Sequence, residues 1–364
     1  MSSGRKPAGD ADIDAGPADH AGWTLEAGKK YASSVDVARL AGVSQSAVSR
    51  TFSGGASVSD GLRKKVLDAA KQLDYRPSLI PRIMLTHKSN LVAIVVGGLY
   101  NPFYSAVLEQ FTIKFQAVGY QVLLVHVASD HALDEVIPKL ASYRVDAIVS
   151  ALAILSPKAA ATLAKLKIPV ISFNTAVKNE WVASVSCNNA EAGRTIADLF
   201  VMRNARSFAF ISGPGESHAS AGRLKGFQDR LNELDAGQAR IGRGDYRYEG
   251  GFAAALELFA EGTKPQALFC ANDLLAIGAI DALKTRLGLR VPEDLLVAGF
   301  DDIPSAAWAS VSLTTFVQDA AAMVEESLGI VLSARNGKPP ATDPVVVSAR
   351  LIERGTTEAR GFQQ

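Results

Sequence analysis

Residues 33–52 read SSVDVARLAGVSQSAVSRTF, and this stretch decides the fold of the N-terminal part of the 364-residue chain. Ser33 and Asp36 have the spacing of a capping box, which marks a helix start. Three apolar residues then recur at helical spacing: Val37, Leu40 and Ala41. Gly42 stands where a helix ends in a left-handed cap, and Ser44 can cap a second helix. Two short helices joined by a glycine turn form a helix-turn-helix.

The second helix is predicted to have one packing face and one polar face. At about 100° per residue, the polar face carries Gln45, Ser46, Ser49 and Arg50. The opposite face carries Ala47, Val48, Thr51 and Phe52. The amide, hydroxyl and guanidinium groups of the polar face can read base edges in the DNA major groove. An ordinary amphipathic hairpin with a solvated polar face is the alternative interpretation.

Two flanking features favour DNA binding. A third helix is predicted to begin near Ser59, with five residues on its packing face: Leu62, Val66, Ala69, Ala70 and Leu73. Between residues 33 and 90, nine lysines and arginines stand against four aspartates, which is a net charge of +5. The whole chain carries +1, so the remaining residues carry +1 minus +5, or −4. Positive charge is therefore concentrated beside the predicted reading helix, where phosphate neutralisation requires it.

These N-terminal residues resemble the headpiece of the lactose/galactose-repressor (LacI/GalR) family of transcription factors. The resemblance rests on residues 34–52, on VS at residues 58–59 and on DYRP at residues 74–77. It implies that three residues read operator bases: Gln45, Ser46 and Arg50. It also implies phosphate contacts by seven residues: Ser33, Ser44, Ser49, Ser53, Ser57, Ser59 and Tyr75. Ala47 is a departure, because the family usually has a hydroxyl there.

Residues 78–89, SLIPRIMLTHKS, match the hinge segment of that family. In the family this segment folds on operator binding, pairs with its counterpart in a dimer and inserts an apolar side chain into the minor groove. Met84 occupies the wedge position, where leucine is usual. Pro81 is a second departure, because proline biases the preceding residue away from helical backbone.

From residue 90 onward, apolar runs alternate with helical patterns. Seven runs are predicted to be buried strands: residues 91–96, 121–127, 147–152, 170–173, 208–212, 267–271 and 295–300. Apolar strands separated by crossover helices are typical of parallel sheets covered on both faces. About 270 residues of this pattern predict an α/β domain of two lobes. One last strand and a short tail are expected within residues 345–362.

Polar residues follow most of these predicted strands, and in open parallel sheets ligands bind beyond the carboxyl ends of the strands. This rule selects residues 101–104, Ser129, Asp130, Asn174, Asn188, Asn272, Asp273, Asp301 and Asp302. Any one of the asparagines and aspartates could instead be a helix N-cap. Their convergence in both lobes favours a ligand cleft, and we include Asp130 and Asn174 among the expected effector-binding residues.

The family resemblance continues through four segments: YNPFY at 100–104, ANDLLAIGA at 271–279, VAGFDD at 297–302 and SLTTFVQD at 312–319. It implies an effector domain like the two-lobed periplasmic sugar-binding proteins. In such a domain Phe103 and Tyr104 would stack on a ligand, Asn272 and Asp301 would bind its hydroxyls, and Tyr246 would form an aromatic wall.

The segment SAGRLKGF, residues 220–227, departs from the family, which usually has two arginines before the Gly-Phe pair. Arg223 matches the second arginine. Ala221 stands at the first, which grips sugar hydroxyls or a carboxylate. This departure weakens the case for a plain monosaccharide as effector.

Composition excludes several classes of protein. Hydrophobic residues make up 48% of the chain and charged residues 21%, and no apolar run is long enough to suggest a membrane span. Two cysteines, Cys187 and Cys270, support neither a disulfide framework nor a zinc site, and the five histidines lack metal-ligand spacing. We expect no cofactor and no metal. The first residues lack the apolar core of a secretory signal, so a cytoplasmic, nucleoid-associated protein is expected.

The resulting hypothesis is a DNA-binding transcriptional regulator, expected to be a repressor, whose operator affinity is controlled by a sugar or related metabolite. The expected domains are a disordered extension (1–32), a headpiece (33–77), a hinge (78–89) and an effector and dimerisation domain (90–364). A homodimer is expected, because a two-fold protein matches a palindromic double-stranded operator. The main alternative is a solute-binding protein for transport. An enzyme such as a sugar kinase is disfavoured, because no phosphate loop, nucleophile elbow or HExxH motif is present.

Overall fold

A computed structural model describes residues 31–52, 58–77, 83, 88–97, 99–127, 133–151, 157–173, 180–215, 217–260, 262, 264–334, 338–341 and 343–358. The chain divides into two compact units, Met1–Thr86 and His87–Gln364. None of the helices in these described ranges combines the length and the apolarity that a membrane span requires.

The first unit is a three-helix bundle of α1 (Ser34–Ala41), α2 (Gln45–Phe52) and α3 (Asp60–Gln72). The predicted capping box is confirmed: Ser33 Oγ accepts from Asp36 N at 3.3 Å, and Ser33 N donates to Asp36 Oδ2 at 2.9 Å. Gly42 has a φ of 64°, the left-handed value that glycine adopts without strain. Ser44 Oγ accepts from Ala47 N at 3.3 Å and so caps α2. Local interactions therefore begin and end α1 and begin α2.

The core of this unit is small and continuous. It contains residues from all three helices: Val37, Ala38, Val48, Val66, Ala69, Ala70 and Leu73. The apolar spacing predicted for α3 is thereby confirmed for Val66, Ala69, Ala70 and Leu73. Phe52 at the end of α2 packs edge-to-face on Tyr75, with ring centroids 5.6 Å apart.

The first lobe of the second unit is built on a six-stranded parallel sheet in the order β11-β5-β4-β3-β1-β2. Its strands are β1 (Leu91–Val96), β2 (Gln121–His126), β3 (Ala147–Ala151), β4 (Val170–Phe173), β5 (Val182–Cys187) and β11 (Val345–Val347). Its helices are α5 (Pro102–Ala117), α6 (Leu133–Ser142), α7 (Pro157–Lys165) and α12 (Ala320–Ser333). Helix α5 packs with α12, and α6 packs with α7.

Side chains alternate between the two faces of this sheet. Ile171 joins one cluster with Phe111 of α5, whereas Val170 joins another with Leu163 of α7. Helices therefore cover both faces, as the unbroken apolar strands predict. Strand β2 differs from the prediction of a buried strand, because it lies at the sheet edge and leaves Leu124 44% exposed.

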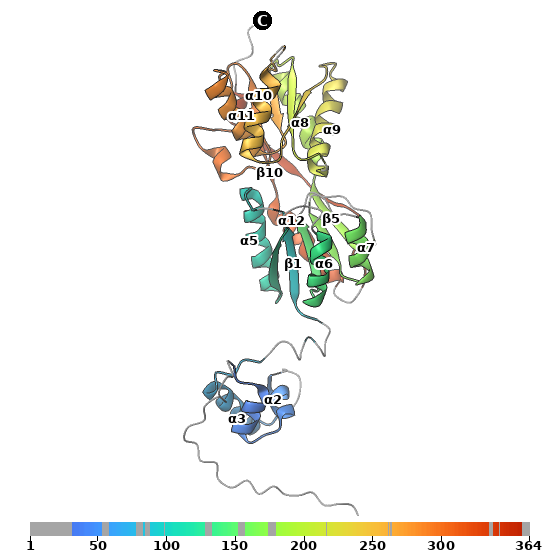
Figure 1. Cartoon of the computed structure of the whole chain (residues 1–364), viewed down its shortest axis with the longest axis vertical. Helices are drawn as coiled ribbons and strands as arrows, with labels where there is room; N and C mark the ends of the chain where they lie inside the picture. The colour runs from blue at the N-terminus through green and yellow to red at the C-terminus, as the bar shows by residue number, and fades with distance from the viewer. Residues whose placement is uncertain are drawn as a thin grey trace, which may run out of the picture. The chain divides into compact units, whose positions relative to one another are not determined.

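The second lobe is built on a four-stranded parallel sheet in the order β7-β6-β8-β9. Its strands are β6 (Phe208–Ser212), β7 (Arg240–Arg243), β8 (Ala267–Cys270) and β9 (Leu296–Ala298). Its helices are α8 (Asn189–Met202), α9 (His218–Glu233), α10 (Tyr248–Ala260) and α11 (Asp273–Arg286). Helix α8 packs along α9 and α10 along α11, and Figure 1 shows these four helices grouped around the second lobe. The predicted α/β fold with two lobes and parallel sheets is thus confirmed.

The chain passes between the lobes more than once. It leaves the first lobe after β5, returns through β10 (Thr315–Gln318), and leaves again between β11 and β12 (Ala349–Ile352). Strands β10 and β12 form an antiparallel pair with Thr315 opposite Ile352. In Figure 1, β10 lies where the two lobes meet. The prediction of one last strand is therefore wrong: β11 and β12 are separated by one residue yet belong to different sheets.

Candidate functional site

The polar face of α2 is the first candidate site. Its four predicted residues are exposed: Gln45, Ser46, Ser49 and Arg50. Ala47, Val48 and Thr51 are buried on the opposite side. The exposed face carries no carboxylate, so it presents no charge that would repel phosphate. The division of the helix into a packing face and a polar face is confirmed.

Three hydrogen bonds hold the exposed side chains in place. Gln45 Nε2 donates to Ser34 Oγ at 3.0 Å, and the hydroxyls of Ser44 and Ser46 are 2.9 Å apart. Arg50 Nε donates to the Ser46 carbonyl at 3.3 Å. Within the described residues, the two terminal nitrogens of Arg50 make no hydrogen bond. The Gln45 amide and the Arg50 guanidinium therefore lie at the surface in defined orientations.

Some of the residues expected to contact phosphate also make capping or packing contacts within the three-helix unit. Ser33 and Ser44 serve as helix caps, and Tyr75 packs on Phe52. Ser59 precedes α3 without making a side-chain capping bond. Ser49 is exposed on α2. Ser53, Ser57 and the hinge residue Met84 lie outside the described residues.

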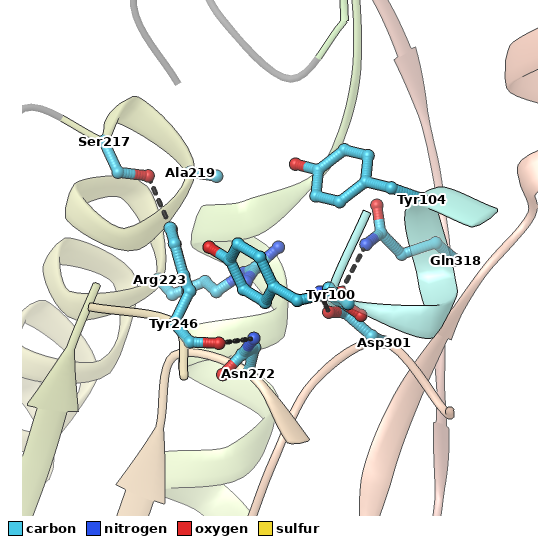
Figure 2. A pocket seen from close by; sticks show the side chains of 10 residues that line it. Tyr100, Tyr104, Ser217, Ala219, Arg223, Tyr246, Asn272, Asp301 and Gln318 are labelled. Atoms are coloured by element: carbon cyan, nitrogen blue, oxygen red, sulfur yellow. Dashed lines mark hydrogen bonds between the residues drawn. The ribbon is translucent and has the colours of Figure 1, made fainter. Parts of the chain in front are cut away.

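The second candidate site is a pocket of about 490 Å³ in the second unit, part of which opens to solvent. Its lining comes from both lobes: Tyr100, Asn101, Tyr104, Ser217, Ala219, Arg223, Tyr246, Asn272, Asp301 and Gln318. Figure 2 shows these side chains converging on one space.

Asp301 is the carboxylate of the pocket, and it joins three segments. Its Oδ2 accepts from Asn101 Nδ2 at 2.8 Å, across the lobes, and its Oδ1 accepts from Gln318 Nε2 at 2.8 Å. Burial raises the pKa of Asp301, while Arg223 and the two amide hydrogen bonds act in the opposite direction. Asp301 has a φ of 120°, a conformation that non-glycine residues rarely adopt. Hydrogen bonds from Asn101 and Gln318 hold Asp301 in this strained backbone conformation.

Arg223 is the cation of the pocket and is buried on α9. Its Nε donates to Asn189 Oδ1 at 2.8 Å, and its guanidinium also donates to the Ala271 carbonyl. The guanidinium carbon lies 3.4 Å from the centroid of the Phe300 ring, which fixes its plane. Arg223 therefore presents a rigid donor group beside Asp301.

Tyr246 forms one wall of the pocket. Its Oη lies 2.5 Å from Ser217 Oγ, and its carbonyl accepts from Asn272 Nδ2 at 3.1 Å (Figure 2). Asn272 also caps α11 by accepting from Leu275 N at 3.0 Å. Gly213 makes room for the ring, because a Cβ there would lie 2.3 Å from Tyr246 Cζ. Burial raises the pKa of Tyr246 and keeps its phenol protonated.

The opposite lobe contributes two tyrosines. Tyr104 on α5 is half-buried near Asp301, and burial of its phenol raises the pKa well above the usual range. Tyr100 is partly exposed, and the Arg247 guanidinium carbon lies 4.0 Å from its ring centroid. Phe103 is not among the lining residues; it is 7% exposed within the hydrophobic core, with its ring centroid 5.3 Å from that of Tyr104. One aromatic of the NPFY segment thus faces the pocket and its neighbour faces the core.

Four of the residues expected to bind effector meet in this pocket: Tyr104, Tyr246, Asn272 and Asp301. Asp130 and Asn174 lie outside the described residues. The sequence placed Asn101 among the strand-end residues of the expected cleft but gave no effector role to five others that line the pocket: Tyr100, Ser217, Ala219, Arg223 and Gln318. The available signal for Tyr100, Asn101, Arg223 and Gln318 was their position in the segments 100–104, 220–227 and 312–319, whereas Ser217 and Ala219 lie in none of these segments.

The interpretation of Ala221 needs correction. Ala221 is exposed on α9 and is not a lining residue. Ala219 and Arg223, four residues apart, share the helix face that reaches the pocket. Position 221 lies two residues from each of them, so its side chain points away. Within α9, the side chains that reach the pocket are therefore Ala219 and Arg223, and Ala221 is not among them.

The arrangement is one of binding groups: three amides, a carboxylate, a guanidinium, a serine hydroxyl and three phenols. Among the described residues, no cluster of three or more histidine, cysteine, aspartate or glutamate side chains has the geometry to hold a metal ion. Asp273, behind the pocket, accepts from Ile303 N at 2.9 Å and from Thr315 Oγ1 at 2.5 Å. It therefore ties α11 to the strand β10 that passes between the lobes.

Comparison with known proteins adds three findings. Residues 35–78 match the family described as bacterial regulatory proteins, lacI family, and residues 197–357 match the periplasmic binding protein-like domain. The chain is 28% identical over 324 residues to the HTH-type transcriptional repressor PurR of Pectobacterium carotovorum, covering 88% of this chain and 95% of that protein. It is 29% identical to catabolite control protein A of Priestia megaterium, covering 78% and 86%.

Among solved structures, the fold is similar to that of the lac repressor dimer bound to operator and the anti-inducer ONPF. The TM-score is 0.80 at 24% identity, and the match covers 90% of this chain and 99% of that one. At this identity the likeness concerns the fold, which is the combination of a three-helix unit with a two-lobed α/β unit.

Proposed function

We propose, from the premise that this chain belongs to the LacI family of bacterial regulatory proteins, that the exposed face of α2 reads operator bases and that a small molecule in the interlobe pocket sets operator affinity. As a LacI-family member, the chain is a DNA-binding transcriptional regulator. The observation that carries the proposal is the surface of α2, where Gln45, Ser46 and Arg50 are exposed and no carboxylate is present. A transport role is not favoured, because a solute-binding protein has no use for the exposed polar face of α2.

In this proposal Ser33, Ser44, Ser49, Ser53, Ser57, Ser59 and Tyr75 contact phosphates, and Met84 is the minor-groove wedge. The basic charge of residues 33–90 supports phosphate contact. We place the headpiece at 33–77, the hinge at 78–89 and the effector domain at 90–364. The chain acts as a homodimer on a palindromic operator in the cytoplasm, because two headpieces read two half-sites.

The pocket supports a small polar effector, such as a sugar or related metabolite. Gln318 Oε1 is a buried acceptor that has no hydrogen-bond partner within the described residues. A ligand hydroxyl or N–H group would satisfy it, which offsets the cost of burying an unpaired acceptor. Arg223 and Asn272 can hold further polar groups, while Tyr104 and Tyr246 cover apolar ring faces.

Effector and operator are coupled through the lobes in this proposal. Asn101 from one lobe and Asp301 from the other meet at the pocket, so a ligand that bonds to Asp301 changes the contact between lobes. A change in lobe angle moves the hinge segments that precede the first lobe. By thermodynamic linkage, the factor by which effector changes operator affinity equals the factor by which operator changes effector affinity.

The DNA-binding half of the proposal is tested by selecting duplexes from a random library with the full chain. We expect enrichment of a palindromic sequence and a steep loss of affinity with salt. Failure to enrich any sequence, in the presence and absence of the metabolite panel below, would contradict base reading.

The effector half is tested by thermal unfolding of the full chain with a panel of sugars, sugar phosphates and nucleobases. A ligand present at 100 times its Kd stabilises the native state by about 2.7 kcal/mol, which is a measurable rise in Tm. Asp301→Asn should abolish the rise. The matched control Asp343→Asn, at an exposed position, should retain it.

A further inference from the structure

The Ser34 hydroxyl lies at the junction of three segments in the first unit. Ser34 is the first residue of α1 and is half-buried. Its Oγ accepts a hydrogen bond from Gln45 Nε2 of α2 at 3.0 Å. The phenol of Tyr75, which follows α3, lies near this hydroxyl: burial raises the pKa of Tyr75, and Ser34 acts to lower it. One hydroxyl therefore links a residue of the exposed α2 face to the end of the bundle.

The direction of this bond fixes the Gln45 amide, because Nε2 donates and Ser34 Oγ accepts at 3.0 Å. The end of the amide that faces Ser34 must then be the NH₂ group. An isolated exposed glutamine has no such constraint and can turn its oxygen and nitrogen about.

The fixed amide has a defined pattern of remaining groups. One N–H of Nε2 is used by Ser34, and the other N–H and the carbonyl oxygen remain for DNA. A donor beside an acceptor is the pattern that matches adenine, whose N7 accepts and whose N6 amino group donates in the major groove. Guanine presents two acceptors there and leaves the amide oxygen unpaired.

We propose that Ser34 is a positioning residue for base readout: its hydroxyl orients the amide of Gln45 so that the half-site position facing Gln45 is read as adenine. This inference rests on the proposed DNA-reading role of α2. It adds a residue outside the exposed face to the set that determines operator specificity.

A purely structural role for the Ser34 hydroxyl is disfavoured by the helix start itself. Ser33, not Ser34, is the N-cap of α1, and Asp36 completes its capping box. The packing residues of α1 are Val37 and Ala38. Loss of the Ser34 hydroxyl therefore removes neither the cap nor a core contact. The aromatic contact of Tyr75 with Phe52 also remains.

The experiment compares the full chain with Ser34→Ala, Ser34→Thr and the control Gln72→Ala, which removes an exposed glutamine of α3. Each protein selects duplexes from the same random library, and affinities are measured for the enriched site and for the site with guanine in place of the expected adenine. Wild type and Gln72→Ala should prefer adenine about fivefold or more. Ser34→Ala should reduce this preference at least threefold, with unchanged affinity for non-specific duplex. Ser34→Thr should restore it.

The outcomes separate the two proposals. If wild type enriches a motif and Ser34→Ala enriches the same motif with the same base preference, the role of Ser34 is overturned while base reading stands. If wild type enriches nothing, base reading fails. The hydrogen bond between Gln45 and Ser34 is then still tested by NMR of the full chain labelled with ¹⁵N-glutamine. The Gln45 Nε2 protons should differ from those of Gln72 and move toward them in Ser34→Ala, and identical spectra would refute that hydrogen bond.

Discussion

Replacement of Asn101 by alanine removes two interactions at once. The side chain caps α5 by accepting from Phe103 N at 3.0 Å, and it donates to Asp301 Oδ2 at 2.8 Å between the lobes. Loss of an N-cap costs about 1 kcal/mol. Loss of a buried hydrogen bond to a carboxylate costs about 1.5–3 kcal/mol. We therefore expect Asn101→Ala to lower the free energy of unfolding of the second unit by about 3 kcal/mol.

Asn188 provides a matched control. It caps α8 by accepting from Glu191 N at 3.3 Å, but it is exposed and makes no bond to a carboxylate. Asn188→Ala should therefore cost about 1 kcal/mol, the value of the cap alone. With about 2 °C of Tm per kcal/mol for a unit of this size, the expected losses are about 6 °C and about 2 °C. Thermal unfolding of both variants without ligand measures them.

The pH dependence of the stability lost in Asn101→Ala distinguishes loss of the bond to Asp301 from loss of the helix cap. The Asn101 bond lowers the pKa of Asp301 against the effect of burial, so its removal raises the native-state pKa further. A raised carboxyl pKa destabilises the native state as pH rises through that range, because the unfolded chain has already lost the proton. The cost of Asn101→Ala should thus be larger at pH 8 than at pH 5. Equal costs for the Asn101 and Asn188 variants at both pH values would refute an interlobe bond.

Three further outcomes test other parts of the molecule. Arg50→Ala should cost about 1–3 kcal/mol of operator affinity and relax specificity; an unchanged ratio of binding to operator and scrambled duplex would contradict base reading by Arg50. Gly213→Ala should displace the Tyr246 ring and abolish the ligand-induced Tm rise with little loss of stability; a retained rise would exclude that ring from the ligand site. Burial raises the pKa of Asp273 from 3.8 to about 7, so the free energy of unfolding should fall by up to about 4 kcal/mol between about pH 4 and pH 7. Asp273→Asn should flatten that profile in pH-dependent denaturant titrations, and an unaltered profile would assign the dependence to another group.

The three-helix unit could be predicted from the sequence because its signals act over short distances. Ser33 and Asp36 are three residues apart, and Gly42 needs only its own backbone conformation. The apolar period of α3 likewise follows from helix geometry. Strands such as β1 and β4 could be predicted with their bounds, because burial on both faces requires an unbroken apolar run.

The pocket could be predicted only in part. Asn272 and Asp301 follow strands, and the rule for parallel sheets brings such residues to one edge. The same rule does not say which of two adjacent aromatics faces the ligand, and Tyr104 and Phe103 take opposite sides. Nor does it show that Ala221 points away from the pocket, since that depends on how α9 is rotated against its sheet.

By itself, then, the sequence determined the helix-turn-helix pair, its charge and the α/β character of the remainder, because each depends on residues within a turn or a strand of one another. Tertiary structure alone decided the bond between Asn101 and Asp301, which are 200 residues apart, and the division of the last strands between two sheets. It also decided the link from Ser34 to Gln45. Such contacts depend on the relative placement of packed elements, and this placement is a property of the whole core rather than of any local pattern.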